Sequence, residues 1–195
     1  MAAHAERSED RVPEITPLGV AVLALLVERP MHPYEMFQLM TQRAAERVVK
    51  VRPGSLYHAV DRLAGQGLVR SIGTERDGNR PERTTYEITE PGHLALTQRL
   101  SDILSRPVNE YPALPLALGE AHNLPRETVG ALLERRLAAL GATLDALLAG
   151  RERVTERGVP ERFWIDLELQ IAMTQAEVRW IADLVDRLRS GAIDW

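Results

Sequence analysis

The sequence of 195 residues contains no cysteine. This absence excludes disulfide bonds, thiolate zinc sites and cysteine nucleophiles. No apolar run approaches the roughly 20 residues that a membrane-spanning helix needs, and residues 1–14 have neither the basic start nor the apolar core of a signal peptide. We therefore expect a cytoplasmic protein that does not contact a membrane, with residues 1–14 forming a flexible polar tail.

Catalytic motifs are also lacking. The histidines occur singly, without the four-residue spacing and the glutamate of a helical zinc site. The sequence contains no glycine-rich loop of the kind that cradles phosphates and no Gly-x-Ser-x-Gly elbow. It therefore predicts a protein that is not an enzyme and that carries no metal or cofactor. The five histidines are His4, His32, His58, His93 and His122.

The formal net charge is −4, but the charges are unevenly distributed. Residues 43–83 contain nine basic and five acidic side chains, whereas residues 91–195 contain 12 basic and 15 acidic ones. A basic segment within an acidic chain is typical of a protein with one face toward phosphate. Because a local excess of four is also common on solvated surfaces, the charge alone does not identify a nucleic-acid interface.

Apolar periodicity, capping residues and prolines predict short helices followed by a β-wing in the first half of the chain. Thr16 precedes a proline and is expected to cap the first helix. Residues 48–51 form a short apolar patch that is compatible with an extended segment. Helices are expected at residues 15–27, 34–45 and 55–66 and from Thr89 to about residue 104, and the strands of the wing at residues 68–72 and 84–88.

Closely spaced prolines indicate a domain boundary after the last of these helices. Everything beyond them is expected to be helical. A helix from Pro125 carries a broad leucine stripe that Gly150 is expected to end, and an Arg- and Glu-rich loop follows. The prolines are Pro107, Pro112 and Pro115, and the predicted domains are residues 15–106 and 107–195.

The last predicted helix has the strictest periodicity in the chain, because eight positions, seven of them apolar, follow one another at alternating spacings of three and four. Such a seam is typical of a helix that packs along another helix at a shallow angle. The spacing does not distinguish a helix of the same chain from one of a second chain. The seam positions are Trp164, Leu167, Ile171, Thr174, Val178, Ile181, Val185 and Leu188.

The predicted helix at residues 55–66 combines an apolar side, formed by Leu56, Val60 and Leu63, with a side rich in hydrogen-bonding groups. Two preceding helices and an arginine-rich wing make it a candidate recognition helix for the major groove of DNA. An ordinary amphipathic helix with a solvated polar face is the alternative. The residues expected at the DNA are Tyr34, Arg52, Ser55, Tyr57, His58, Arg62, Arg76, Arg80 and Arg83.

Several short motifs carry a family resemblance. They are His32-Pro33-Tyr34-Glu35, Pro53-Gly54-Ser55-Leu56-Tyr57, Gly67-Leu68-Val69 and Tyr86-Glu87-Ile88-Thr89 before Pro91-Gly92. With them, residues 15–92 resemble the winged helix-turn-helix domain of the PadR family of bacterial transcriptional regulators. Residues after about 107 resemble, by their layout, the all-helical C-terminal domain of the longer family members.

The resemblance implies a mainly α fold with a small β-wing, followed by an all-helical dimerisation domain. It also implies a homodimer that binds double-stranded DNA at an inverted-repeat operator and usually represses nearby genes. It favours a second chain as the partner of the seam. The implied dimer interface comprises Trp164, Leu167, Ile171, Val178, Ile181, Val185 and Leu188.

Ligand-responsive members of the family bind a small hydrophobic or phenolic effector that lowers DNA affinity. Phe163, Trp164 and Trp180 are the aromatic candidates for an effector pocket in this chain. Aromatic residues of this kind more often serve ordinary packing. One further hypothesis remains, in which the winged domain binds an acidic protein partner and has no specific affinity for DNA.

Overall fold

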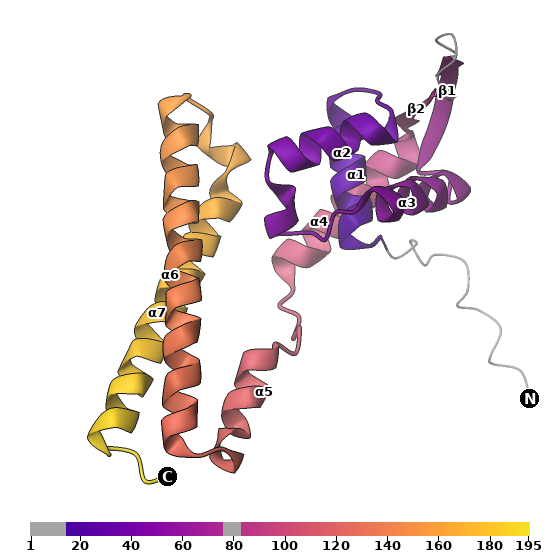
Figure 1. Cartoon of the computed structure of the whole chain (residues 1–195). Helices are drawn as coiled ribbons and strands as arrows, with labels where there is room; N and C mark the ends of the chain where they lie inside the picture. The colour runs from indigo at the N-terminus through magenta and orange to yellow at the C-terminus, as the bar shows by residue number, and fades with distance from the viewer. Residues whose placement is uncertain (1–14, 76–82) are drawn as a thin grey trace, which may run out of the picture. The chain divides into compact units, whose positions relative to one another are not determined.

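The computed structural model describes residues 15–75 and 83–195. The chain forms two compact units that divide between Asn109 and Glu110 (Figure 1). We call them the winged unit and the helical unit. In the described part of the chain, no helix combines the length and the apolar character needed to cross a membrane.

The winged unit begins with two helices whose first turns are both capped, the first of them by Thr16 as the sequence predicts. Helix α1 (Pro17–Glu28) starts after Thr16, whose Oγ1 accepts a hydrogen bond from the Gly19 N–H at 3.2 Å. Helix α2 (Pro33–Gln42) starts after His32, whose Nδ1 accepts the Tyr34 N–H at 3.1 Å. Both helices place proline in the first turn, where the missing N–H breaks no hydrogen bond.

Helix α2 ends earlier than expected. Ala44 has a left-handed backbone with φ 51°, and the short 3₁₀ helix η1 (Ala45–Arg47) follows it. Residues 48–51, whose apolar character was compatible with an extended segment, pair with no strand that the structure describes, and Val48 is exposed. They form an irregular connection to the next helix.

Helix α3 (Pro53–Gly65) is the predicted recognition helix, and its apolar side lies in the core as expected. Leu56, Val60 and Leu63 are at most 2% exposed. Gly67 ends the helix with φ 70°, and its N–H and that of Leu68 donate to the carbonyls of Ala64 and Leu63. This left-handed turn suits glycine, and it directs the chain into the wing.

The wing consists of strands β1 (Val69–Glu75) and β2 (Arg83–Ile88), which pair antiparallel from Val69 opposite Ile88. A register shift lies between Ser71 and Gly73. Met31, between α1 and α2, forms an isolated antiparallel β-bridge with Tyr86 of β2. Its N–H and its C=O both form hydrogen bonds with the backbone of Tyr86. The predicted wing is confirmed, and the bridge joins it to the helical layer.

Helix α4 (Glu90–Ser105) is fixed to the turn that follows α3. Thr89 caps it, accepting the Gly92 N–H, and also donates its hydroxyl to the Gly67 carbonyl at 2.7 Å. The Thr89 N–H donates to the carbonyl of Leu68. A Cβ at Gly92 would lie 2.1 Å from the same carbonyl oxygen, so only glycine fits this approach.

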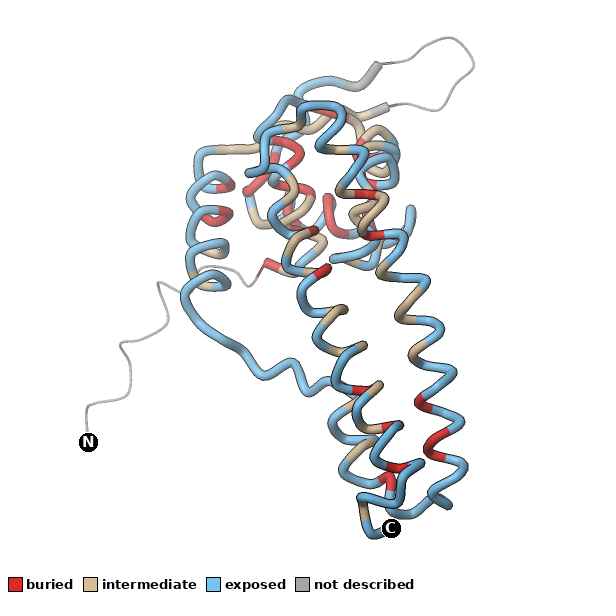
Figure 2. The backbone as a smooth tube through the Cα atoms, turned by 90° about the vertical axis from the view of Figure 1, so that its left-hand side faces the viewer, coloured by how far each residue is buried: buried red, intermediate tan, exposed pale blue. Residues whose placement is uncertain are grey.

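One hydrophobic core holds the winged unit together. Its buried side chains come from α1, α2, α3, β1 and α4, as well as from Ile15, Met31 and Leu68 in connecting segments. Figure 2 shows these buried positions gathered between the helices, whereas the long helices of the other unit carry them only at intervals.

The helical unit contains α5 (Ala113–Gly119), the 3₁₀ helix η2 (Ala121–Asn123), α6 (Arg126–Glu156), the 3₁₀ helix η3 (Glu161–Phe163) and α7 (Ile165–Ser190). The predicted stop at Gly150 and the Arg- and Glu-rich loop after it are wrong. One glycine costs a helix only about 1 kcal/mol, and the following Arg and Glu residues favour helix, so α6 continues to Glu156. It ends at Gly158, which has φ 65°.

Helices α6 and α7 lie side by side as an antiparallel hairpin (Figure 1). Val129 and Leu133 near the start of α6 pack with Ile181, Val185 and Leu188 near the end of α7. At the other end of the hairpin, Leu147 packs with Leu167 and Ile171. Cross-helix ion pairs accompany these contacts, namely Arg136–Glu177, Arg189–Glu134 and Arg151–Glu168.

The seam of α7 is therefore covered by α6 and its neighbours in the same chain. This packing corrects the predicted dimer interface. Five of its residues are 0–3% exposed because α6 and its neighbours cover them: Leu167, Ile171, Ile181, Val185 and Leu188. Trp164 and Val178 are half-buried, and Trp164 precedes α7 as its N-cap residue. The spacing had left open an intrachain partner, and the structure supplies one.

Candidate nucleic-acid interface

The exposed side of α3 presents the polar residues that the sequence singled out. Ser55, Tyr57, His58 and Arg62 are all exposed, as is Asp61 of the same helix, and the Tyr57 side chain is 42% exposed. The opposite side of the same helix is fully buried. Packing therefore fixes which face of α3 is available to a ligand outside the unit.

The N-terminus of α3 is open to solvent. Arg52 occupies the N-cap position and is exposed, and its side chain accepts no capping hydrogen bond. Nothing lies within 4 Å of the position that a Cβ would take at Gly54. Backbone N–H groups in the first turn of a helix favour phosphate oxygens, so Arg52 and Ser55 stand where a DNA strand would meet both charge and donors.

Helices α2 and α3 meet through His32. The rings of His32 and Tyr57 make an edge contact with centroids 6.2 Å apart. Because His32 also accepts the Tyr34 N–H, this ring links the first turn of α2 to Tyr57 on α3. Tyr34 itself is 52% exposed.

Arg62 has a partner that the sequence did not indicate. Its Nη2 donates to Thr16 Oγ1 at 3.0 Å, so the guanidinium lies against the start of α1. Near the neighbouring Asp61, burial raises the pKa of the Tyr86 hydroxyl, and the negative charge of the Asp61 carboxylate adds to the shift. Arg62 thus helps to hold α3 on α1, in addition to the base-reading role predicted for it.

The wing offers fewer described cations than the sequence predicted. Arg76 and Arg80 lie outside the described residues, and so does the side chain of Arg83, although its backbone at the start of β2 pairs with Glu75 of β1. Arg70 is described and forms an ion pair with Glu87 at 2.6 Å. The predicted contacts of the three wing arginines with DNA therefore stay predictions.

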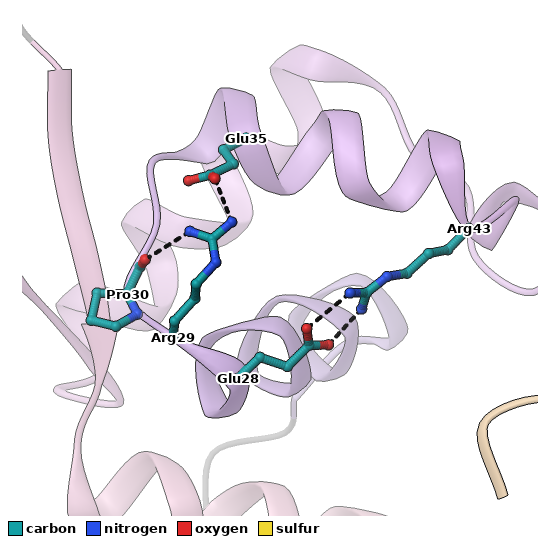
Figure 3. A network of polar contacts seen from close by, with 5 residues as sticks. All are labelled: Glu28, Arg29, Pro30, Glu35 and Arg43. Atoms are coloured by element: carbon teal, nitrogen blue, oxygen red, sulfur yellow. Dashed lines mark hydrogen bonds and ion pairs between the residues drawn. The ribbon is translucent and has the colours of Figure 1, made fainter. Parts of the chain in front are cut away.

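Two ion pairs fasten α2 to the end of α1 (Figure 3). Arg43, after the end of α2, binds both carboxylate oxygens of Glu28, with Nη2 at 2.9 Å from Oε2. Arg29 binds Glu35 in the first turn of α2 and also donates to the carbonyl of Pro30. The hydrogen bonds from Arg43 and Arg29 lower the pKa values of Glu28 and Glu35 respectively.

The aromatic residues proposed for an effector pocket do not converge. Phe163 is exposed, with the Arg162 guanidinium 4.7 Å from its ring centroid. Trp164 donates its indole N–H to the Val159 carbonyl at 2.9 Å, which closes the turn before α7. Trp180 lies 15 residues beyond Ile165, or roughly 22 Å along the helix axis. One small ligand therefore cannot contact Phe163 and Trp180 together.

Three features of the interface were not foreseen from the sequence: the Met31–Tyr86 bridge, the His32 contacts and the bond from Arg62 to Thr16. The proline spacing around His32 indicated a helix start, and a histidine at that position is a possible cap. The other two contacts join residues 46 or more positions apart, so no local pattern encodes them. Within the described residues, no group of three or more histidine or carboxylate side chains is placed to hold a metal ion.

Comparison with known proteins gives a family match for the winged unit. The sequence model of the transcriptional regulator PadR-like family matches residues 22–98, which span the helices and the wing of the winged unit. A comparison of the sequence with curated proteins found no match.

Solved structures share the fold over most of both chains. Bacillus subtilis PadR in complex with operator DNA is similar with a TM-score of 0.74 and 18% identity, over 90% of this chain and 99% of that one. The same protein in complex with p-coumaric acid gives 0.70 and 16%, over 89% and 98%. A PadR-like transcriptional regulator from Bacillus cereus gives 0.64 and 16%, over 89% and 99%.

The expected fold is confirmed, since a winged helix-turn-helix unit precedes a helical unit in a mainly α chain. Through residues 22–98 of its winged unit, this chain is similar to the PadR-like family of transcriptional regulators.

Proposed function

We propose that this chain is a cytoplasmic, homodimeric repressor that binds an inverted-repeat operator and releases it when a small phenolic or hydrophobic effector binds. The observation that carries the proposal is the two-sided character of α3. One side is buried in the core, and the other presents Tyr57, His58 and Ser55 to solvent beside an exposed helix N-terminus.

In the proposed complex, α3 enters the major groove while its first turn contacts phosphate. Arg52 and Ser55 position the helix on the backbone, and Tyr57, His58 and Arg62 lie toward the bases. Tyr34 adds a contact from α2. A dimer would place two copies of α3 about one helical turn, roughly 34 Å, apart on one face of the duplex.

Residues 107–195 form the dimerisation part in this proposal. The likeness to a PadR solved with p-coumaric acid supports a phenolic acid as the effector class to test first. The predicted aromatic pocket is not assembled within one chain, so Trp164 and Trp180 enter the proposal as separate candidates for contact with such a ligand.

Selection of binding sites from a random DNA pool tests the proposal most directly. We expect an enriched palindrome whose half-sites are about 10 base pairs apart, centre to centre. Enrichment of a single half-site would contradict the dimeric geometry, and no enrichment would contradict sequence-specific binding.

Substitutions distinguish residues that contact the bases from residues that contact the DNA backbone. Tyr57→Ala and Arg62→Ala should lower the preference for the selected operator over random duplex, by about 1–3 kcal/mol if the lost contact reads a base. Arg80→Ala with Arg83→Ala should instead weaken binding to both DNAs about equally. If all four substitutions left operator affinity unchanged, the DNA face would lie elsewhere.

Salt dependence distinguishes DNA from a protein partner. Binding through several phosphates should weaken log-linearly as salt is raised, while the preference for the operator persists. A winged unit that binds an acidic protein would lose affinity with salt but show no preference among duplexes.

The effector is tested by titrating the operator complex with p-coumaric acid. We expect release of DNA together with a change in tryptophan emission. If a panel of phenolic acids and hydrophobic drugs altered neither DNA binding nor tryptophan emission, the proposed effector would be contradicted. The proposed operator binding and repression would not be affected by that result.

A further inference from the structure

The exposed side of α3 has a centre that differs from its two edges. At 100° per residue, His58 and Asp61 lie within roughly 30° of the direction opposite the buried side of the helix. Tyr57 and Arg62 lie on the two edges, roughly 70° from that direction. Both central residues are exposed. A histidine and a carboxylate are therefore the side chains that face most directly away from the core, and the complex proposed above gives Asp61 no contact.

The edge residues are engaged within the winged unit, whereas the central ones are not. Arg62 donates to Thr16 at 3.0 Å, and the ring of Tyr57 contacts the ring of His32. Neither central side chain forms a hydrogen bond or an ion pair with any residue among 15–75 and 83–195. Their hydrogen-bonding groups are available to a ligand.

Two glycines lie on the same line of the helix. Gly54 and Gly65 stand about one turn before His58 and one turn after Asp61, within roughly 10° of the centre of the exposed side. Nothing lies within 4 Å of the position that a Cβ would take at either glycine. Packing inside the unit therefore does not require glycine there, although glycine disfavours helix. It lets the backbone of α3 approach a surface closely on both sides of the central pair.

A carboxylate at the centre of this face distinguishes the bases of DNA by what it can accept. An ionised carboxylate accepts hydrogen bonds and donates none. In the major groove, cytosine offers its N4 amino group as a donor, whereas guanine presents two acceptors and thymine presents one beside its methyl group. Adenine presents an amino donor next to the N7 acceptor, so a carboxylate there meets one attractive and one repulsive group. Cytosine is therefore the base that Asp61 matches best.

His58 complements this match. A neutral imidazole has one N–H donor, and the guanine that pairs with cytosine presents N7 and O6 as acceptors. Residues three positions apart on a helix are neighbours on its surface. His58 and Asp61 thus present a donor beside an acceptor, and a C·G base pair presents the complementary groups in the groove.

From these observations we propose that Asp61 is a specificity-determining residue of α3, whose carboxylate accepts a hydrogen bond from the N4 amino group of a cytosine in each half-site. This inference rests on the operator binding of the proposed function and adds the base that one operator position must carry. The same carboxylate repels phosphates, so it weakens binding to duplexes that lack the matching base. Asp61 therefore raises selectivity while it lowers general affinity for DNA.

The first test is selection of binding sites by the full-length chain from a randomised DNA pool. The parent should enrich sites with cytosine at one fixed position of each half-site. Asp61→Asn should shift that position toward adenine, because an amide pairs with N6 and N7 of adenine, and Asp61→Ala should leave it without preference. Glu90→Gln is the matched control, since it neutralises an exposed carboxylate of the same unit that lies on α4. It should select the parent sites.

Affinities on defined duplexes give the size of the effect. Replacing the selected C·G pair by T·A should weaken binding of the parent about tenfold more than it weakens binding of Asp61→Ala. Asp61→Ala should also bind random-sequence duplex about two- to tenfold more tightly than the parent, because a negative charge leaves the phosphates. A solvated carboxylate that contacts no base would give the second effect without the first. Both Asp61 variants should melt with the parent, which shows that a lost preference is not a loss of folding.

The outcomes separate this inference from the proposed function. If both Asp61 variants select the same sites as the parent, Asp61 reads no base and the proposed operator binding stands. If the position that changes carries a base other than cytosine in the parent sites, the hydrogen bond to N4 is wrong. A parent chain that enriches no site would overturn both the inference and the operator.

Discussion

The two units of this chain bury their apolar residues in different ways. The winged unit gathers fifteen buried side chains into one cluster to which four helices and a strand contribute. The helical unit has two smaller clusters, of six and three buried residues, spaced along the hairpin of α6 and α7. A hairpin has only one internal seam, so its outer faces stay exposed unless another layer covers them.

The difference indicates which unit covers its own apolar residues and which one leaves some of them for a partner to cover. The core of the winged unit is closed on several sides by its own elements, whereas α7 leaves a row of large apolar residues in solvent. The first pattern suits a rigid frame for a recognition helix. The second suits a part whose packing is completed by association.

The largest expected effect comes from truncating one buried leucine in each core. Leu56→Ala should lower the free energy of unfolding by about 3–5 kcal/mol, because Leu56 is fully buried and its cavity cannot collapse easily. Leu147→Ala should cost nearer 2 kcal/mol, since its three-residue cluster can relax. Urea unfolding of the two variants measures both values, and equal losses would show that the hairpin core is packed as rigidly as the other.

Two glycines give the next contrast. Gly92→Ala should destabilise by about 1–3 kcal/mol or more, because its Cβ would meet the backbone oxygen of Leu68 at 2.1 Å. Gly130→Ala on α6 should stabilise by about 0.5–1 kcal/mol, because nothing lies within 4 Å of its Cβ and alanine favours helix. Thermal unfolding should move the two melting temperatures in opposite directions. A stabilising Gly92→Ala would contradict the close docking of α4.

A smaller loss is expected at the joint between α3 and α4. Thr89→Val removes the cap on Gly92 and the bond to the Gly67 carbonyl, and should cost about 1–2 kcal/mol. Thr89→Ser keeps the hydroxyl and is the matched control. It should unfold within about 0.5 kcal/mol of the parent, and a valine variant as stable as the parent would show that the two hydrogen bonds of the hydroxyl do not stabilise this joint.

The smallest effect concerns the ion pairs between α1 and α2. The pKa values of Glu28 and Glu35 are lowered in the folded protein, so their stabilisation is present above the unfolded value of about 4.3 and is lost as the pH falls through the lowered folded values. Both carboxylates are largely exposed, so we expect at most about 1 kcal/mol. Glu28→Gln with Glu35→Gln should reduce the fall of the melting temperature at acid pH, and the melting temperatures of parent and variant should converge once both carboxylates of the parent are protonated in the folded state. High salt should reduce the difference, and identical curves at pH 6 would contradict it.

Local chemistry was sufficient to predict most of the winged unit. Thr16, Pro17, Thr89 and Pro91 marked helix starts, and the helix at Leu56 showed its buried side through its spacing. These signals act within one turn of the chain, so a sequence displays them directly. The long-range bonds of the interface, such as that from Arg62 to Thr16, depend on how finished helices pack and left no local trace.

The helical unit shows where periodicity is insufficient. The alternation along α7 correctly indicated a helix–helix seam, but the same spacing serves a partner in either chain. The exposed row on the opposite side of α7 escaped notice because Leu169, Met173 and Trp180 are separated along the sequence by the residues of the seam and by charged positions. Gly150 was expected to end α6, but the helix ends before Gly158, whose positive φ allows the turn. The residue type alone does not show which glycine adopts such a backbone angle.

The bridge between Met31 and Tyr86 restricts how the chain can vary in length. Only residues 29–32 connect α1 to α2, and one of them is bonded on both sides to the wing. An inserted or deleted residue here would shift the register of Met31 against β2 or break its two backbone bonds. The stretch between Ser105 and Ala113 has no comparable sheet contact. Insertions and deletions should therefore be tolerated between the two units and selected against inside the helix-turn-helix.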